Sequence, residues 1–304
     1  LGLDNNQNNP PTSEMPQGSS SISFSDFYSR RLNVVVDHHS GSTQYRQIAR
    51  DRYNSNNVRV IGGFKGRPSN SGGTQVIIHV NKTFGSENSG QNHCALRTGS
   101  WDSNTLLQID VGSSGRIYGA GGDGGNGSRE DGESGESGSS GLGVQYSPCK
   151  LNVRPGGLIS AGFGGGGGGG GGHDHDKNSE RHAGGGGGGG GAGLPAGEGG
   201  NRATGSEEAD GGNGTDGSLD TAGEGGHGSN NENEATGGAG GEGGQSGEEA
   251  NEGGSGGGGE GSENRGGEPG DDGSALRRTN SGYSVTISNS GTIRPSTSLA
   301  NGVG

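Results

Sequence analysis

One pattern of hydrophobic and polar positions returns three times along the chain. It reads aliphatic, any residue, aliphatic, three further residues, glycine, one residue, isoleucine. The copies are IDVGSSGRI at 109–117, LNVRPGGLI at 151–159 and VTISNSGTI at 285–293. Aliphatic side chains two positions apart face the same side of a β-strand. The glycines Gly115, Gly157 and Gly291 are expected to supply the positive φ of a tight turn. The pattern therefore predicts three strand–turn–strand units.

Further extended runs come before the first copy. Three of them are rich in β-branched and aliphatic residues and read as strands: VRVIGG at 58–63, TQVIIHV at 74–80 and TLLQIDV at 105–111. With Phe64, Phe84 and Trp101 as core residues, they predict a small β-rich domain over residues 55–112.

The N-terminal region has a different character. Residues 21–36 (SISFSDFYSRRLNVVV) begin with alternating apolar positions and are then expected to form a short helix capped by Ser25. The first twenty residues are rich in Asn, Pro, Ser and Gln and read as an arm that orders against a partner. The predicted domains are an arm and attachment segment at 1–54, the β-rich domain at 55–112, a glycine-rich region at 113–275 and a C-terminal strand segment at 276–304.

In the glycine-rich region the other residues recur with a period of three. The spacing separates Ala120, Asp123 and Asn126, then Glu224 and His227, and also Ala239 and Glu242. Three residues per turn is the period of the polyproline II helix. A bundle of such helices leaves one position per turn facing outward. The spacing thus predicts polyglycine II helices, which are polyproline II-type helices made of glycine, packed side by side.

The energetics favour a bundle over isolated helices. Ordering the backbone of one residue costs about 1–2 kcal/mol, and a lone polyproline II helix has no internal hydrogen bonds. Helices without Cβ atoms can approach closely enough to exchange backbone hydrogen bonds, each worth about 0.5–1.5 kcal/mol. The uninterrupted glycine runs at 164–172 and 184–191 are therefore expected at the centre. Collagen has the same period but does not fit, because the chain has only nine prolines and one clean Gly-X-Y stretch, at 132–141.

Composition sharpens this picture. The chain has 304 residues, of which 79 are glycine and only 21% are hydrophobic, so one ordinary hydrophobic core cannot serve its whole length. Such a composition by itself would indicate a disordered linker, but a linker has no reason to keep a three-residue period. The expected fold class is mostly irregular and β structure. A small β-rich N-terminal region precedes the polyglycine II bundle with its polar loops, and a C-terminal strand follows.

Charge and cysteine content exclude several classes of protein. The net charge of −13 lies wholly in residues 151–304, which argues against a nucleic-acid partner. No apolar stretch approaches the roughly 18 residues of a transmembrane helix, so no membrane insertion is expected. Cys94 and Cys149 show no CxxC spacing, and two cysteines do not make a disulfide scaffold. They are expected to be small buried apolar residues.

These motifs resemble those of a known family. SGRIYGAGGDGGNG (114–127), GGLISAGFGGGGGGGGG (156–172) and GYSVTISNSGTIRPS (282–296) are similar to segments of bacteriophage tail-fibre tip adhesins with a polyglycine II sandwich domain. SISFSDFY (21–28) resembles a segment common near the start of phage fibre proteins. The resemblance implies a receptor-binding protein of the virion tail, in which a rigid glycine stem presents variable loops to a bacterial surface protein or glycan. It also implies attachment to other tail or fibre proteins, here through residues 1–112, as a homotrimer or a single cap.

Under this resemblance the insert HDHDKNSERHA at 173–183 is a receptor-contact loop. It connects the two longest glycine runs, and function concentrates in loops held by a rigid scaffold. Counting reversals of the chain predicts that 128–140, 173–183, 215–222 and 246–252 share the distal tip, while 201–210, 229–236 and 262–265 lie at the base. The candidate receptor-binding residues are His173, Asp174, His175, Asp176, Lys177, Asn178, Glu180, Arg181, His182, Asp216, Asp220, Glu248 and Glu249.

Other chemistries have weaker signals. His173, Asp174, His175, Asp176 and His182 carry metal-ligating atoms, but their alternation in a loop defines no ligand geometry. Acidic pairs such as Glu248-Glu249 and Asp271-Asp272 more often keep a surface soluble than bind Ca²⁺. No spacing of Ser, His and Asp suggests a nucleophile with its base. No metal, cofactor or enzymatic activity is therefore expected. Two alternatives stay open: a purely structural glycine-rich virion protein, and an ice-binding protein.

Overall fold

The computed structural model of the chain describes residues 31–36, 47–48, 58–60, 75–86, 89–99, 101, 105–176, 179–205, 210–229, 235–251 and 264–302. In this part all regular elements are β-strands, and no helix there could cross a membrane. The β-rich character is thereby confirmed. The helix expected after Ser25 is wrong where the structure describes it, because the β-branched run Arg31–Val36 forms a strand that pairs with Gln75–Val80.

The strands lie in four sheets. Their bounds are β1 Arg31–Val36, β2 Gln47–Ile48, β3 Val58–Val60, β4 Gln75–Val80, β5 Thr83–Phe84, β6 Cys94–Arg97, β7 Leu106–Val111, β8 Arg116–Tyr118, β9 Ser140–Val144, β10 Cys149–Val153, β11 Leu158–Ser160, β12 Gly172–Asp176, β13 Ser179–Ala183, β14 Leu276–Arg278, β15 Val285–Asn289, β16 Thr292–Arg294 and β17 Leu299–Asn301. All except the pair β12–β13 belong to one body, which we call the head.

The head is a parallel β-helix, in which the chain visits three sheets in turn. The orders are β15-β10-β7-β4-β1-β3 in the first sheet, β16-β11-β8-β5 in the second and β17-β14-β9-β6-β2 in the third. Successive coils are thus β4–β5–β6, β7–β8–β9, β10–β11–β14 and β15–β16–β17. Pairing within these sheets is parallel, apart from the antiparallel pair β1–β3.

The three sequence repeats form successive corners of this β-helix. They become β7–β8, β10–β11 and β15–β16, so the predicted strands are confirmed. Equivalent positions stack in register: Leu151 pairs with Ile109 on one side and Ile287 on the other, and Ile159 lies opposite Ile117. The aliphatic positions of each copy therefore build one continuous row in the core.

The glycines of the repeats are needed for space rather than for a positive φ. Gly115, Gly157 and Gly291 all lie outside the left-handed region, so that expectation is wrong; in the second copy Gly156 has the positive φ, at 85°. A Cβ at Gly115 would lie 2.1 Å from the carbonyl oxygen of Val80 in the preceding coil. The missing side chain is what lets consecutive coils approach at this corner.

The hydrophobic core of the head draws on strands from both ends of the chain. Its largest fully buried side chains are Phe84, Ile78, Leu96, Leu107, Ile109, Ile117, Leu142, Leu151, Ile159 and Leu276. Trp101 is buried as expected, whereas Phe64 lies outside the described residues. Leu142 and Leu276 are 134 positions apart yet pair in register, so the third sheet closes only when the chain has returned from the glycine-rich region. The boundaries expected at 55–112 and 276–304 stay predictions.

Both cysteines behave as expected. Cys94 and Cys149 are buried and form no disulfide. Burial raises the pKa of the Cys149 thiol to about 12, so the group stays protonated and unreactive near neutral pH.

A buried charged cluster joins three strands of the first sheet. The Asp110 carboxylate, 3% exposed, accepts hydrogen bonds from Asn152 Nδ2 at 2.8 Å and from Arg154 Nε at 3.1 Å and Nη2 at 2.5 Å. His79 Nδ1 lies 3.3 Å from the same carboxylate. Burial raises the pKa of Asp110, but the contacts with His79 and Arg154 outweigh it and hold the pKa at about 2. The carboxylate therefore stays ionised inside the sheet.

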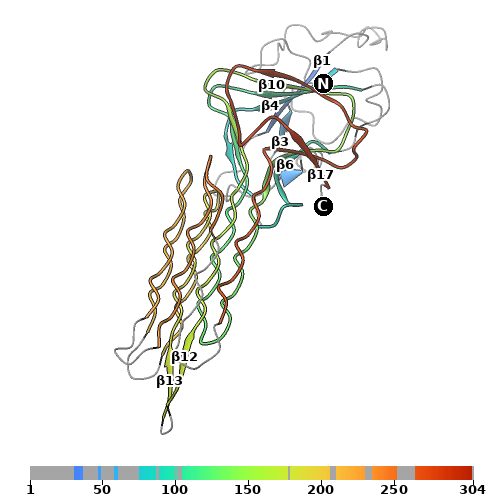
Figure 1. The fold of residues 1–304 in the computed structure, drawn as a ribbon. Helices are drawn as coiled ribbons and strands as arrows, with labels where there is room; N and C mark the ends of the chain where they lie inside the picture. Colours follow the sequence, from blue (N-terminus) through green and yellow to red (C-terminus); the bar gives the residue numbers. More distant parts are fainter. Residues whose placement is uncertain are drawn as a thin grey trace, which may run out of the picture.

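Glycine-rich segments extend from the head as a long bundle (Figure 1). They enter after β8 and β11, both times between the second and third sheets, and we call residues 119–139 and 161–273 the glycine bundle. Neighbouring segments exchange backbone hydrogen bonds at every third residue. The amides of Gly122, Gly125 and Ser128 donate to the carbonyls of Phe163, Gly166 and Gly169 at 2.9, 2.9 and 3.1 Å. The period of three in the sequence is thus the period of contact between segments.

Two segments lie at the centre of the bundle. Residues 185–192 use every amide and carbonyl in bonds to other segments. The amides donate to residues 119–128, 211–218 and 237–244, and the carbonyls accept from residues 161–169, 197–203 and 223–229. Residues 162–171 likewise contact six neighbouring segments, of which residues 184–192 are one. The central position expected for the runs 164–172 and 184–191 is confirmed.

At the edge of the bundle, side-chain oxygens replace the missing neighbour. They accept backbone N–H groups from the adjacent segment: Asp123 from Glu198 at 2.7 Å, Asn126 from Asn201 at 2.8 Å, Asn213 from Arg202 at 3.0 Å and Asp216 from Gly199 at 2.9 Å. An unpaired amide costs about 1–3 kcal/mol when it is shielded from water. Some of the acidic side chains of the bundle therefore serve as hydrogen-bond acceptors for backbone N–H groups at its edge.

Asp272 performs the same role close to the head. Its Oδ1 accepts the amide N–H of Gly164 at 2.9 Å. Burial, and then the nearby Glu249 and Asp271 carboxylates, raise the pKa of Asp272 to about 6 against the opposing effect of this hydrogen bond. The folded state holds the proton of Asp272 more tightly than the unfolded chain does. The contribution of this group to stability is therefore fully present below about pH 4, and it is lost as the pH rises through 6.

Replacing Asp272 by asparagine should stabilise the protein near pH 7. The amide oxygen still accepts the Gly164 N–H, while the unfavourable charge is removed. Since the site is partly exposed, we expect the free energy of unfolding to rise by only about 1 kcal/mol. This corresponds to a rise in Tm of about 2–4 °C. Thermal unfolding from pH 4 to 7 measures this change. The Tm of the variant should depend less on pH above 4 than the Tm of the wild type. The control Asp271→Asn removes only the smallest contribution to the raised pKa of Asp272 and should leave most of that dependence in place. A lower Tm at pH 7 for Asp272→Asn would show that the carboxylate charge is required.

Candidate functional site

The chain reverses direction alternately at the head and at the far end of the bundle. The described turns at the head are 193–196, 218–222 and 244–250. At the far end lie the turn 128–131, the hairpin β12–β13, and the described residues 203–205, 210–211, 228–229, 235–236 and 264–265. The prediction of the tip is correct for the described residues of 173–183 and for the turn 128–131. It is wrong for the rest of the insert 128–140, because residues 132–139 return along the bundle and Ser140 begins β9 in the head. The prediction is also wrong for the later inserts, because their described residues lie at the end of the bundle opposite to the one expected.

One missed turn explains the reversal. Residues 193–196 contain Leu194 and Pro195 and no charge, so the pattern places them within one long glycine tract. In the structure Ser86 of the head donates its amide to the Leu194 carbonyl at 2.9 Å, which places this turn at the head. A single additional reversal moves every later insert to the opposite end.

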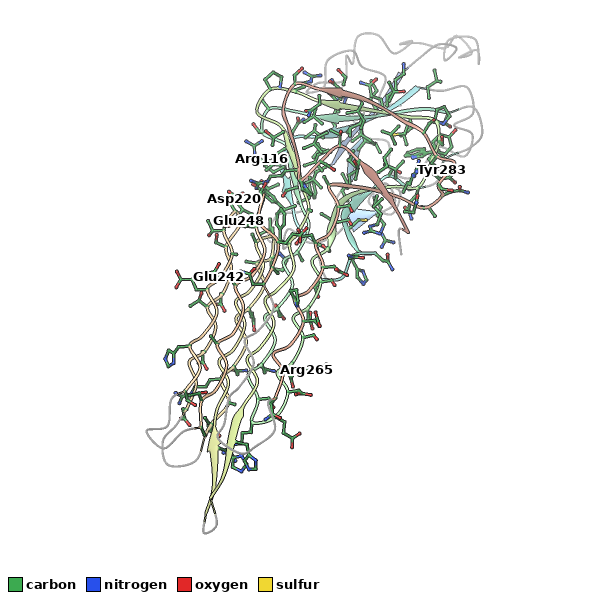
Figure 2. All side chains as sticks on the ribbon, viewed as in Figure 1. Arg116, Asp220, Glu242, Glu248, Arg265 and Tyr283 are labelled. Atoms are coloured by element: carbon green, nitrogen blue, oxygen red, sulfur yellow. The ribbon has the colours of Figure 1, made fainter. Side chains whose placement is uncertain are left out.

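Asp216, Asp220, Glu248 and Glu249 therefore lie apart from the other candidate residues. Figure 2 shows Asp220 and Glu248 beside the head, near Arg116. Asp220 forms an ion pair with Arg294 of β16, and Gln245 donates a hydrogen bond to Glu248 within its own turn. They lie towards the head, at the opposite end of the bundle from the hairpin at 173–183.

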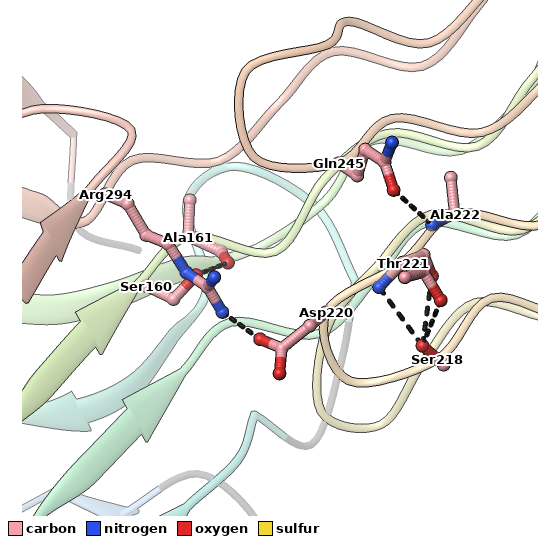
Figure 3. Close-up of polar contacts among 8 residues, drawn as sticks. All are labelled: Ser160, Ala161, Ser218, Asp220, Thr221, Ala222, Gln245 and Arg294. Carbon is pink, nitrogen blue, oxygen red and sulfur yellow. Dashed lines mark hydrogen bonds and ion pairs between the residues drawn. The ribbon is translucent and has the colours of Figure 1, made fainter.

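Instead, the head-end turns are joined to the β-helix (Figure 3). The Arg294 guanidinium donates to Ser160 Oγ at 3.1 Å, pairs with Asp220 and lies 5.8 Å from the centre of the Tyr118 ring. Gln245 accepts the amide of Ala222 at 3.2 Å and so connects two neighbouring turns. These contacts hold the base of the bundle against the second sheet.

The insert at 173–183 is a β-hairpin rather than an irregular loop. Strands β12 and β13 pair antiparallel, with His173 opposite His182, Asp174 opposite Arg181 and His175 opposite Glu180. The His173 and His182 rings stack at the root, with centroids 4.4 Å apart and an interplanar angle of 18°.

The hairpin gives each candidate a defined place. His173, Asp174, His175 and Asp176 belong to β12; Glu180, Arg181 and His182 belong to β13. Lys177 and Asn178 lie outside the described residues. Among the described side chains no group of three or more His, Cys, Asp or Glu is arranged to hold a metal ion.

Other segments interlock beside the hairpin root, and sequence reasoning missed them. The Arg129 guanidinium donates to the Thr204 carbonyl, and to its Oγ1 at 3.1 Å. Asn264 Nδ2 donates to the carbonyls of Arg129 at 3.1 Å and of Gly171 at 2.8 Å. The far end is thus one surface assembled from several turns.

Two more arginines lie on this surface, in different states. The Arg202 guanidinium forms an ion pair with Asp210 at 3.2 Å. Arg265 is exposed and donates its backbone amide to Asp131 Oδ1 at 2.8 Å (Figure 2). A signal for these residues was present in the sequence: within the glycine bundle Lys and Arg occur only at 129, 177, 181, 202 and 265. It became informative only when the turns were assigned to one end.

Comparisons with known proteins cover both parts of the molecule. The family model of the phage tail fibre adhesin Gp38 matches residues 46–301. Among solved structures, the chain is similar to the gp37–gp38 adhesin tip complex of the bacteriophage S16 long tail fibre. That match has 19% identity and a TM-score of 0.36, and covers 95% of this chain and 89% of the other. A search of curated proteins found no match.

Proposed function

The chain belongs to the phage tail fibre adhesin Gp38 family, and from this premise we propose that it binds a bacterial surface receptor through the far end of its glycine bundle. Membership identifies it as an adhesin of the virion tail. The proposal rests on a contrast between the two ends of the bundle. Every described turn at the head is bonded to the β-helix or to a neighbouring turn, whereas the far end presents a protruding β-hairpin. The protein acts by binding, without catalysis.

We further infer that the bundle consists of polyglycine II helices. Support comes from backbone hydrogen bonds repeating every third residue, and from six neighbouring segments around each central run. The close spacing of neighbouring segments also supports this inference, because a Cβ built on Gly188 would lie 2.1 Å from the carbonyl oxygen of Gly166. Such a lattice is stiff because its interior amides and carbonyls are paired with other segments. Stiffness is what a stem needs in order to hold binding groups in place.

The head is the part that we propose to mount on another tail protein, with residues 1–112 as the attachment region. Attachment as a homotrimer or as a single cap is compatible with this assignment. Several copies on one virion would bind together and strengthen weak individual contacts.

Adsorption inhibition tests the proposed function. The full chain is added to bacteria susceptible to the phage that carries it, before challenge with that phage. In one variant residues 174–181 are replaced by Gly and Ser, which keeps the stacked His173 and His182 at the hairpin root. In a matched control, residues 246–249 at the head receive the same replacement. We expect the wild-type chain and the control to block adsorption, and the hairpin variant to need about tenfold more protein or worse.

The alternative outcomes are informative. If the wild-type chain binds no susceptible cells, the protein is a structural part of the tail and the proposal is wrong. If the control at 246–249 loses activity while the hairpin variant keeps it, the receptor contact lies at the head end. Circular dichroism of each variant verifies that the bundle is intact.

A further inference from the structure

Positive charge in the glycine bundle is confined to the far end. The bundle contains 26 Asp and Glu but only five Lys and Arg, and all five belong to inserts whose described residues lie at that end. The described carboxylates along the stem, such as Asp123, Glu224 and Glu242, have no basic residue on their segments between the two ends. An acidic stem with cations only at its tip favours end-on approach to a surface that carries negative groups.

Three arginines at the tip have described side chains, and these are not equivalent. The guanidinium of Arg129 is bonded to the Thr204 carbonyl and hydroxyl, and that of Arg202 is paired with Asp210. Arg265 differs: its exposed guanidinium has no hydrogen bond or ion pair to any other described residue. Two arginines thus hold the surface together, and one is available to a ligand.

The backbone that carries Arg265 is held on both sides. Its amide donates to Asp131 Oδ1 at 2.8 Å, and its carbonyl accepts the Gly132 amide at 2.8 Å. The preceding residue, Asn264, is bonded to two further segments through its side chain. Fixing the backbone in advance lowers the entropy lost when the guanidinium binds a partner.

We propose that Arg265 pairs with a carboxylate in an exposed loop of a host surface protein, a step that rests on the proposed function. The planar guanidinium offers two parallel N–H donors, which match the two oxygens of a carboxylate. Glu130, Asp131 and Asp210 lie on the same end, and a phosphate with nearly two negative charges would be repelled by them more strongly than a single carboxylate. A surface of mixed charge therefore fits a protein loop better than a phosphorylated glycolipid.

Arginine variants of the full chain test this proposal in the adsorption-inhibition experiment. For Arg265→Ala we expect an apparent affinity lower by about tenfold or more, and for Arg265→Lys an intermediate loss. The melting temperature should not change, because the guanidinium forms no hydrogen bond or ion pair with a described residue. Glu268→Gln is the matched control: it removes one exposed charge three positions along the same segment and should leave adsorption unchanged. Higher salt should weaken the wild type more than Arg265→Ala.

Treatments of the cells identify the partner. Protease digestion of surface proteins, and conversion of surface carboxylates to neutral amides, should each abolish binding of the wild-type chain. Competition by purified surface glycolipid or polysaccharide would overturn the assignment to a protein. Equal activity of Arg265→Ala and wild type would overturn the role of Arg265, while the hairpin variant would still decide the proposed function separately.

Discussion

Replacing Gly188 by alanine is expected to unfold the glycine bundle. Gly188 lies in a central segment, where its amide donates to Gly125 at 2.8 Å and its carbonyl accepts Gly200 at 2.7 Å. A Cβ there would lie 2.1 Å from the carbonyl oxygen of Gly166, and backbone cannot rotate away as a side chain can. Neighbouring segments would have to separate, at about 3 kcal/mol or more for the overpacking and about 0.5–1.5 kcal/mol for each hydrogen bond lost.

The opposing effect of alanine is too small to compensate. Alanine restricts the unfolded chain and so stabilises the folded state by only about 0.4–1 kcal/mol. Thermal and denaturant unfolding followed by circular dichroism measures the balance. Glu242→Ala on a neighbouring segment is the control, because this exposed position faces outward and should change stability by less than about 0.5 kcal/mol. If Gly188→Ala melted like the wild type, the close packing of central segments would be incorrect.

Replacing Asp110 by asparagine should destabilise the head strongly. The shape of the side chain is kept, but the negative charge that balances Arg154 is lost, and the new amide NH₂ faces the donors of Asn152 and Arg154. Breaking a buried ion pair costs about 3–5 kcal/mol, and we expect the lower part of that range because Arg154 is half exposed. Denaturant unfolding near pH 7 should show this loss.

The pH dependence provides a second measurement on the same variant. The pKa of Asp110 is lower in the folded state than its ordinary value, so its contribution to stability is present above pH 4 and is lost as the pH falls through 2. The wild type should therefore lose stability over this window, and Asp110→Asn should lose much less. Asn152→Ala removes one neutral hydrogen bond from the same carboxylate and should cost only about 1 kcal/mol. Equal losses for the two variants would contradict an ionic role.

The two parts of the molecule share one register. Leu276 pairs with Leu142 in the head at a separation of 134 residues, and the same separation recurs along the bundle. Ser274 donates to Ser140, Asp271 to Ser137 and Arg265 to Asp131, each 134 positions apart. The β-helix therefore sets the alignment of the segments that it carries, and with it the position of Arg265 at the tip.

Local periodicities in the sequence determined much of this protein. The three repeats predicted strands that the β-helix contains, and the period of three predicted the contact period of the glycine segments. The uninterrupted runs at 164–172 and 184–191 were correctly expected at the centre, because a residue surrounded by six backbones has no room for a side chain. Each of these inferences depends only on neighbours along the chain.

The tertiary structure alone decided which segments meet. Glycine has no side chain to indicate its neighbour, so the sequence reveals the period of a run but neither its direction nor its partners. The uncharged turn at Leu194 and Pro195 reversed the ends assigned to Asp216, Asp220, Glu248 and Glu249, and it brought Arg129, Arg202 and Arg265 to one surface. Gly115, likewise, is required by the backbone of Val80 in another coil rather than by its own φ. Such contacts join residues far apart in the chain, and only the folded arrangement of backbones specifies them.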